Sequence, residues 1–149
     1  MAGFAQTHRI TDVCMLVADV ERAIAFYTEK LGFVLRRRAE GFADFKGAGI
    51  TLALWEIGHM AEHTGVSPRR APPLVHKACV AVELGSPDEV DRLHAELAAK
   101  GVHFVRPPGD FPWNARCCYF ADPDDNLWEL YAWLDGGPVG DLDEVEDRA

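Results

Sequence analysis

The feature that most constrains the fold is an internal repeat: the order of predicted elements in the first half of the chain returns in the second. Each half reads as one strand, one amphipathic helix and three further strands. Gly32 and Gly101, the glycines predicted to end the two helices, lie 69 residues apart. Such a repeat indicates that one unit cannot bury its sheet alone and packs against a copy. We therefore expect an α+β fold of two tandem βαβββ modules.

Both helices are predicted from hydrophobic spacing and capping residues. The first has Asp19 as its N-cap, and its apolar residues fall at spacings of four, three and four, at Val20, Ile24, Tyr27 and Leu31. The second begins at the sequence SPDE (86–89), which supplies an N-cap serine, a proline at the first helical position and a glutamate at the capping-box position. Its buried face is formed by Val90, Leu93 and Leu97.

Eight strands are predicted around these helices, and together they set the module boundaries. They are 12–18, 33–38, 42–47 and 50–57 in the first half, and 76–82, 102–107, 115–121 and 127–134 in the second. Within a single domain over residues 1–149 we expect module one at about 9–57, a Gly- and Pro-rich linker at about 58–75, module two at about 76–134 and an acidic tail at 135–149. No helix is predicted in the linker, so His59 and His63, four residues apart, are expected to be exposed.

Composition narrows the function. The net charge of −9 argues against nucleic-acid binding, and −5 of it falls in the last fifteen residues. The first ten residues lack the apolar core expected of a signal peptide, and no apolar run approaches membrane-spanning length. Its four cysteines lack zinc-type spacing and are expected to be small core-filling thiols, with the adjacent Cys117 and Cys118 on opposite faces of a strand. We therefore expect a soluble cytoplasmic protein that interacts with neither membranes nor nucleic acid.

Two phrases resemble one known family. The sequence VADVERAIAFYTEKLGF in the first half, and YFADPDDNLWEL near the end, are similar to motifs of the vicinal-oxygen-chelate superfamily, which contains glyoxalase I, extradiol dioxygenases, fosfomycin-resistance enzymes and bleomycin-binding proteins. The match covers roughly residues 9–134. The resemblance implies curled mixed sheets around a cavity, with homodimers common and modules paired within one chain or across two. The motifs specify the fold and not a reaction.

The resemblance also implies a candidate metal set of Asp12, His76 and Glu129. The family often places histidine early in the first strand of each module, where this chain has Asp12 and His76, and its final-strand glutamate falls on Glu129. One imidazole and two carboxylates suit Mn²⁺ or Fe²⁺, and Zn²⁺ or Ni²⁺ is also considered. Glu129 could also serve as a catalytic proton shuttle. Each residue taken singly could instead be a solvated or satisfied strand-end side chain. No nucleotide cofactor is expected.

The tripeptide LWE occurs twice, ending at Glu56 and at Glu129. If the two copies were equivalent, Glu56 would be a fourth ligand, as in the glyoxalase I pattern. The more usual family register instead aligns Ala53 with Glu129, and this shift of three residues reverses the strand face. On that register Ala53 cannot coordinate a metal, and Glu56 is expected to be solvated.

Aromatic and basic residues complete the candidate set. Phe111 and Trp113 lie in a predicted Pro-containing loop and, with Tyr131, could bind a planar ligand; packing at a dimer interface would explain them equally well. Arg36 to Arg38 could meet an anionic substrate, although most of the run should be solvated.

Two functions follow from these features. The first is a divalent-metal-dependent lyase, isomerase or dioxygenase that acts on a small oxygenated molecule. The alternative is a metal-free protein that sequesters a small molecule, as resistance proteins of the bleomycin-binding type do. Asp12 and Ala53, which depart from the fuller ligand patterns, favour the alternative. A purely dimeric scaffold has no positive support.

Overall fold

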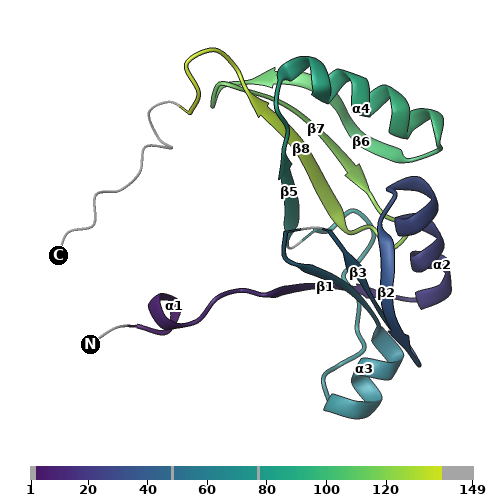
Figure 1. The fold of residues 1–149 in the computed structure, drawn as a ribbon. Coiled ribbons are helices and arrows are strands. Elements are labelled where there is room, and N and C mark those ends of the chain that lie inside the picture. Colours follow the sequence, from purple (N-terminus) through teal and green to yellow (C-terminus); the bar gives the residue numbers. More distant parts are fainter. Residues whose placement is uncertain (1–2, 48, 77, 139–149) are drawn as a thin grey trace. The chain divides into compact units, whose positions relative to one another are not determined.

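The computed structural model describes residues 3–47, 49–76 and 78–138. It divides the chain into two compact units, Met1–Pro73 and Leu74–Ala149. Each unit holds one open four-stranded sheet, in the order β1-β4-β3-β2 in the first and β5-β8-β7-β6 in the second. This repeated arrangement confirms the predicted α+β fold of two βαβββ units (Figure 1). Among the helices of the described residues, none is long and apolar enough to cross a membrane.

The first unit combines one mixed sheet with short helices. Its elements are α1 (Phe4–Thr7), β1 (Asp12–Val17), α2 (Val20–Ala25), the π-helical turn η1 (Phe26–Lys30), β2 (Val34–Ala39), β3 (Phe42–Lys46), β4 (Thr51–Glu56) and α3 (Ile57–Thr64). Strand β1 is parallel to β4, and the other neighbours are antiparallel. The core of this unit lies on the α2 side of the sheet, where Val17, Tyr27, Phe45 and Leu54 are almost fully buried.

Helix α2 begins where the sequence predicts. The Asp19 carboxylate accepts hydrogen bonds from the backbone N–H groups of Glu21 and Arg22 at 2.9 and 3.1 Å. The Glu56 carboxylate accepts another, from the Val20 N–H at 3.0 Å. Glu56 is therefore half-buried on the helix side of the sheet, and the prediction that it is solvated is wrong. A carboxylate at this position satisfies an otherwise unpaired donor and complements the helix dipole.

Helix α3 corrects the prediction that the linker contains no helix. It follows β4 directly and buries Met60. The Trp55 indole N–H donates to His59 Nδ1 at 3.0 Å, which ties the first turn of α3 to β4. His59 is half-buried as a result, whereas His63 is exposed as predicted. The two imidazoles stack at 4.1 Å between ring centroids, and the helix ends at Gly65 in the left-handed conformation, φ 74°.

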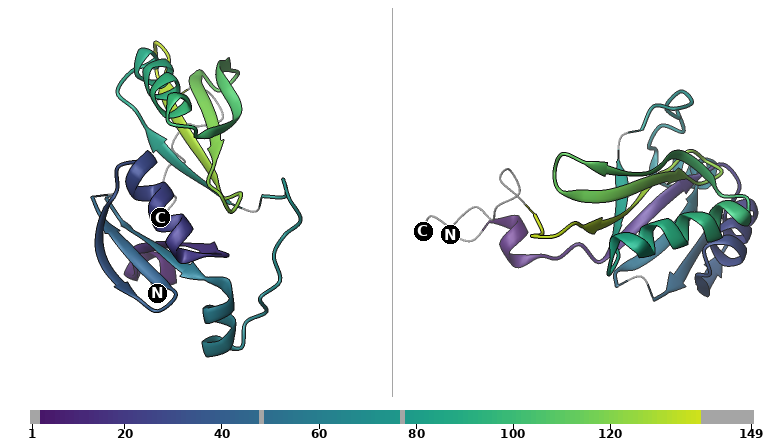
Figure 2. Two further views of the ribbon diagram at one scale, coloured as in Figure 1. Left: turned by 90° about the vertical axis from the view of Figure 1, so that its right-hand side faces the viewer. Right: turned by 90° about the horizontal axis from the view of Figure 1, so that it is seen from above.

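The second unit contains β5 (Cys79–Glu83), α4 (Pro87–Ala99), β6 (His103–Phe111), β7 (Ala115–Ala121) and β8 (Leu127–Trp133). Strand β5 is parallel to β8, as β1 is to β4 in the first unit. The prediction that this first strand begins at His76 is wrong, because β5 begins three residues later and His76 lies before it. Figure 2 shows α4 lying along its sheet.

Helix α4 covers one face of the second sheet, mainly over β6, β7 and β8. The Ser86 hydroxyl accepts from the Glu89 N–H, and the Glu89 carboxylate accepts from the Gly85 N–H at 2.9 Å. This reciprocal cap reaches one residue further back than the predicted capping box. Beneath the helix an aromatic series connects His94 to the sheet, through Phe104, Phe120 and Trp128.

Candidate ligand-binding face

The second sheet has a face turned away from α4 that carries polar and aromatic side chains. Along β8, Trp128, Leu130 and Ala132 are buried on the helix side. The alternate residues are only half-buried, on the open face: Leu127, Glu129, Tyr131 and Trp133. This alternation confirms the predicted strand parity, in which Glu129 and Tyr131 share a face opposite Trp128 and Leu130.

Glu129 is paired with a tyrosine on this face. Tyr119 of β7 is its cross-strand neighbour, and the Tyr119 hydroxyl donates a short hydrogen bond to Glu129 Oε2. Burial, this hydrogen bond and the Glu129 charge raise the pKa of the Tyr119 phenol well above its usual range. The phenol therefore stays protonated at neutral pH and holds the carboxylate in place as a donor. Sequence reasoning missed Tyr119, although the alternation of β7 was available as a signal.

Aromatic rings stand beside this pair at the turn between β6 and β7. The Phe111 and Trp113 rings stack at 4.7 Å between centroids, and Tyr119 meets Phe111 edge-on at 6.1 Å. Phe111 is the last residue of β6, so its predicted placement in a loop is wrong; Trp113 does lie in the turn and is 39% exposed. The Arg106 guanidinium lies 5.3 Å from the centre of the Phe111 ring.

The turn that carries Trp113 is fixed by Asn114. Asn114 adopts a left-handed backbone, φ 61°, which asparagine tolerates better than most residues. Its side-chain amide donates to the carbonyl oxygens of Asp135 and Gly137 at 3.0 and 2.9 Å. The exposed indole is therefore presented by a braced turn, which lowers the entropic cost of using it to bind a ligand.

The thiols of this unit are not poised as nucleophiles. Cys117 and Cys118 are buried, and opposite strand parity places Cys117 on the open face and Cys118 on the α4 side, as predicted. Desolvation of the sulfur raises the pKa of Cys117 and, together with the Glu129 charge, that of Cys79, and it raises the pKa of Cys118 to about 12. At neutral pH these groups are thiols and not thiolates. The expectation of core-filling thiols is wrong for Cys14 and Cys79, which are exposed strand residues.

Strand pairing settles which residue of the first unit corresponds to Glu129. Ala81 of β5 is opposite Glu129, and Cys14 of β1 is opposite Ala53. The helix N-caps that follow these strands, Asp19 and Ser86, lie 67 residues apart, as do Cys14 and Ala81. Ala53 therefore occupies the position of Glu129, as the predicted register requires.

The same correspondence separates His76 from Asp12. With the 67-residue offset, Asp12 matches Cys79, so His76 is not the counterpart of Asp12 in the strand. His76 Nδ1 lies 2.8 Å from the Asp125 carbonyl oxygen, and its Nε2 lies 3.7 Å from the Asp125 carboxylate. Asp12, in the first unit, is exposed and accepts a hydrogen bond from the Thr11 hydroxyl at 2.6 Å.

These partners do not form a metal-binding donor set. Within the described ranges, no three His, Cys, Asp or Glu side chains come together as a group that could hold an ion. His76 Nδ1 contacts the Asp125 carbonyl oxygen, and one carboxylate oxygen of Glu129 accepts the hydrogen bond from the Tyr119 hydroxyl. The equivalent position in the first unit carries Ala53, which has no donor atom. Taken one at a time, neither unit's described residues therefore supply a complete ligand set for the divalent metal that the family often binds.

The first unit has its own charged cluster on the corresponding sheet face. Asp44 of β3 is completely buried, and its carboxylate accepts hydrogen bonds from both Arg36 and Arg37. An irregularity in β2 between Leu35 and Arg37 lets two consecutive arginines reach one carboxylate. The third, Arg38, pairs with Glu21. All three arginines are exposed, as predicted, although each also pairs with a carboxylate.

Two repeated βαβββ units with open mixed sheets define the vicinal-oxygen-chelate class of protein. Comparison with known proteins agrees: residues 9–130 match the family model for the Glyoxalase/Bleomycin resistance protein/Dioxygenase superfamily. The chain belongs to this superfamily.

Similar proteins span several descriptions within the family. An uncharacterized protein of Bacillus subtilis is 27% identical over 130 residues, covering 85% of this chain and 99% of that protein. A bleomycin resistance protein of Geobacillus stearothermophilus is 26% identical over 121 residues, which cover 77% of this chain and 89% of that protein. The solved structure of a glyoxalase/bleomycin resistance protein/dioxygenase from Nocardioides is 47% identical in sequence and has a TM-score of 0.84. The match covers 91% of this chain and 90% of that one.

Proposed function

We propose that this protein binds a small aromatic molecule without a metal ion, on the open face of the second sheet. The ligand's ring would stack on Trp113 and Phe111, and its hydrogen-bond donor or cationic group would meet the Glu129 carboxylate, with Tyr131 beside it. The observation that carries the proposal is the Tyr119–Glu129 pair next to the stacked Phe111 and Trp113 rings. Aromatic walls with a few placed polar groups are typical of small-molecule sites.

The Glu129 carboxylate suits a donor ligand for electrostatic reasons. One of its oxygens already accepts from Tyr119, and the group is half-buried, so a second donor would replace water on the remaining lone pairs. Hydrogen bonds to ionised groups are stronger than neutral ones. The similarity to a bleomycin resistance protein supports a sequestering role and suggests bleomycin as a first test ligand.

The proposal is tested by tryptophan-fluorescence titration with bleomycin and with a planar cationic dye. We expect saturable quenching that W113A weakens about tenfold, since base-type stacking on an aromatic side chain contributes about 1–3 kcal/mol. The matched control is V82A, because Val82 is an exposed apolar residue of the same sheet with the opposite strand parity. Equal weakening in both variants, or no saturable binding of either compound, would refute the proposal.

The metal-dependent enzyme is the competing hypothesis. In it Asp12, His76 and Glu129 would bind the ion, which would polarise a substrate oxygen, and Glu129 would also move a proton. Metal analysis of the purified wild type and H76A discriminates the two. Stoichiometric Fe, Mn, Zn or Ni in the wild type that is lost in H76A would favour the enzyme.

We further propose that the protein works as a cytoplasmic homodimer. The four free cysteines are compatible with a reducing compartment, and dimers are common in the superfamily. Light scattering coupled to size-exclusion chromatography measures the assembly directly. A mass of 16.5 kDa, that of one chain, would contradict the dimer.

A further inference from the structure

We propose that a cavity in the first unit is an oxyanion site for a small molecule that bears a phosphate or carboxylate group. It lies beside Gly47, which follows β3, and Gly49, which precedes β4, and has a volume of about 660 Å³. Its lining includes three basic side chains and two threonines, Arg9, Arg36, Lys46, Thr11 and Thr51. This site is separate from the face proposed above and does not depend on it.

Arg36 is held in place before any ligand arrives. Its Nε and Nη2 donate to the two oxygens of the Asp44 carboxylate at 3.2 and 2.8 Å, a two-point contact that fixes the plane of the guanidinium. Asp44 is itself completely buried, so it serves as a rigid anchor. The Nη1 group takes no part in this contact and is available to a ligand at the cavity wall.

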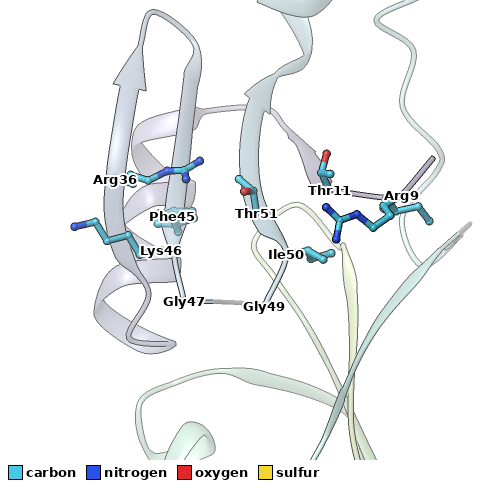
Figure 3. A pocket seen from close by; sticks show the side chains of 10 residues that line it. Arg9, Thr11, Arg36, Phe45, Lys46, Gly47, Gly49, Ile50 and Thr51 are labelled. Atoms are coloured by element: carbon cyan, nitrogen blue, oxygen red, sulfur yellow. The ribbon is translucent and has the colours of Figure 1, made fainter. Parts of the chain in front are cut away.

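Arg9 lies across the cavity from Arg36. Figure 3 shows the two guanidinium groups directed from opposite sides toward Thr51, whereas the Lys46 ammonium points away from it. In the described part of the chain, Arg9 has no carboxylate partner. Two guanidinium groups and a hydroxyl therefore line one cavity, and these are the donor types that bind phosphate and carboxylate oxygens.

The local charge is opposite to that of the chain as a whole. Two cationic groups, the guanidinium groups of Arg9 and Arg36, face the cavity in a protein of net charge −9. Two carboxylates act on Arg36: Asp44, which pairs with both Arg36 and Arg37, and Asp12, through its charge. Asp12 would therefore compete with a bound anion, and its removal should strengthen binding.

The apolar part of the lining defines the rest of the ligand. Ile50 is 43% exposed and Ile10 is 80% exposed, and both line the cavity together with the buried Phe45. The cavity is several times larger than a phosphate group, whose size is comparable to a few water molecules of about 30 Å³ each. The ligand class is thus an anionic group attached to a compact apolar body.

The test is isothermal titration calorimetry of the full chain with sodium phosphate and, separately, sodium acetate, with the ionic strength held constant by sodium chloride. We expect saturable binding of at least one anion with a Kd of about 1 mM. Phosphate binding alone identifies a phosphate ligand, and acetate binding alone identifies a carboxylate. Absence of saturable binding of both would overturn the proposal.

The matched variants are R36Q and R37Q. Both remove one positive charge and one arginine from Asp44, but Arg37 does not line the cavity. R36Q should weaken binding about tenfold and R37Q less than twofold, while D12N should tighten it. R9Q provides a second variant that breaks no Asp44 contact, should R36Q fail to fold. Equal effects of R36Q and R37Q, or no effect of R9Q, would show that no site exists here.

Discussion

Replacing Asp44 with asparagine should destabilise the first unit and free Arg36. The Asp44 side chain is 1% exposed, and its carboxylate accepts four hydrogen bonds, at 3.2 and 2.8 Å from Arg36 and at 2.9 and 2.5 Å from Arg37. An asparagine of the same shape keeps one acceptor oxygen but turns an NH₂ group toward arginine donors. D44N therefore removes the negative charge and leaves the arginine N–H donors facing the asparagine NH₂ group, which is itself a donor.

The expected loss of stability in D44N depends on how exposed the two arginine partners of Asp44 are. Hydrogen bonds to charged groups contribute about 1.5–3 kcal/mol each, but four full contributions would overstate the effect. The Arg36 and Arg37 side chains are 37% and 68% exposed, so water already solvates much of their charge. We expect a loss of about 3 kcal/mol. In a chain of this length that lowers Tm by about 6–12 °C.

The pH dependence has a definite sign. The arginine hydrogen bonds hold the pKa of Asp44 well below its usual range, whereas in the unfolded chain it is about 3.9. A lowered folded pKa contributes stability that is present above the unfolded pKa and is lost as pH falls toward the folded value. The stability difference between wild type and D44N should therefore be constant from about pH 5 to 8 and shrink below about pH 4.

The assay is urea denaturation of wild type, D44N and R37Q, followed by far-UV circular dichroism at pH 7 and pH 3. R37Q is the control. It removes two of the four hydrogen bonds to Asp44, but the Arg37 side chain that makes them is largely exposed, so the variant should lower the free energy of unfolding by less than about 1 kcal/mol. A D44N effect below about 0.5 kcal/mol at pH 7 would refute this reasoning. So would a difference that grows as the pH falls.

Three further predictions concern other parts of the chain. Y119F leaves Glu129 without its donor and should lower stability by about 1 kcal/mol in urea denaturation, while an unchanged midpoint would mean that water replaces the phenol fully. S86A removes the side-chain cap of α4 and should also cost about 1 kcal/mol, and a neutral result would show that the Glu89 contact suffices. Desolvation of the sulfur and the Asp12 charge raise the pKa of Cys14 to about 11, so in iodoacetamide labelling at pH 8 this thiol should react at least about tenfold more slowly than free cysteine. Buried Cys117 should react only in denaturant, and rapid labelling of either native thiol would contradict its assigned environment.

Features encoded locally were predictable from the sequence. The spacing of apolar residues and the caps at Asp19 and Ser86 placed α2 and α4 correctly, because these signals act within a single turn. Strand alternation placed Glu129 and Tyr131 on one face. The register that matches Ala53 with Glu129 was predicted from the resemblance to the family, whose usual register aligns these two positions, and strand pairing confirms it.

The incorrect predictions concern residues whose partners are distant in the sequence, or strands with local irregularities. Helix α3 depends on burying Met60 and on the contact between Trp55 and His59, neither of which a Gly- and Pro-rich composition reveals. The hydrogen bonds from both Arg36 and Arg37 to Asp44 require a bulge in β2, which changes the expected alternation of side chains. His76 was placed in a strand because it resembled a family position, whereas pairing with β8 begins only at Cys79.

The central claim is that the open face of the second sheet binds a ligand without metal, and one measurement tests it most directly. Wild-type protein stripped with EDTA is titrated with bleomycin by fluorescence, then again after addition of Fe²⁺, Mn²⁺, Zn²⁺ or Ni²⁺. We predict saturable binding in the stripped protein, weakened about tenfold in W113A, with the metal additions leaving the Kd unchanged within about twofold. Binding that appears only when a divalent ion is restored, and that H76A abolishes, would contradict the account.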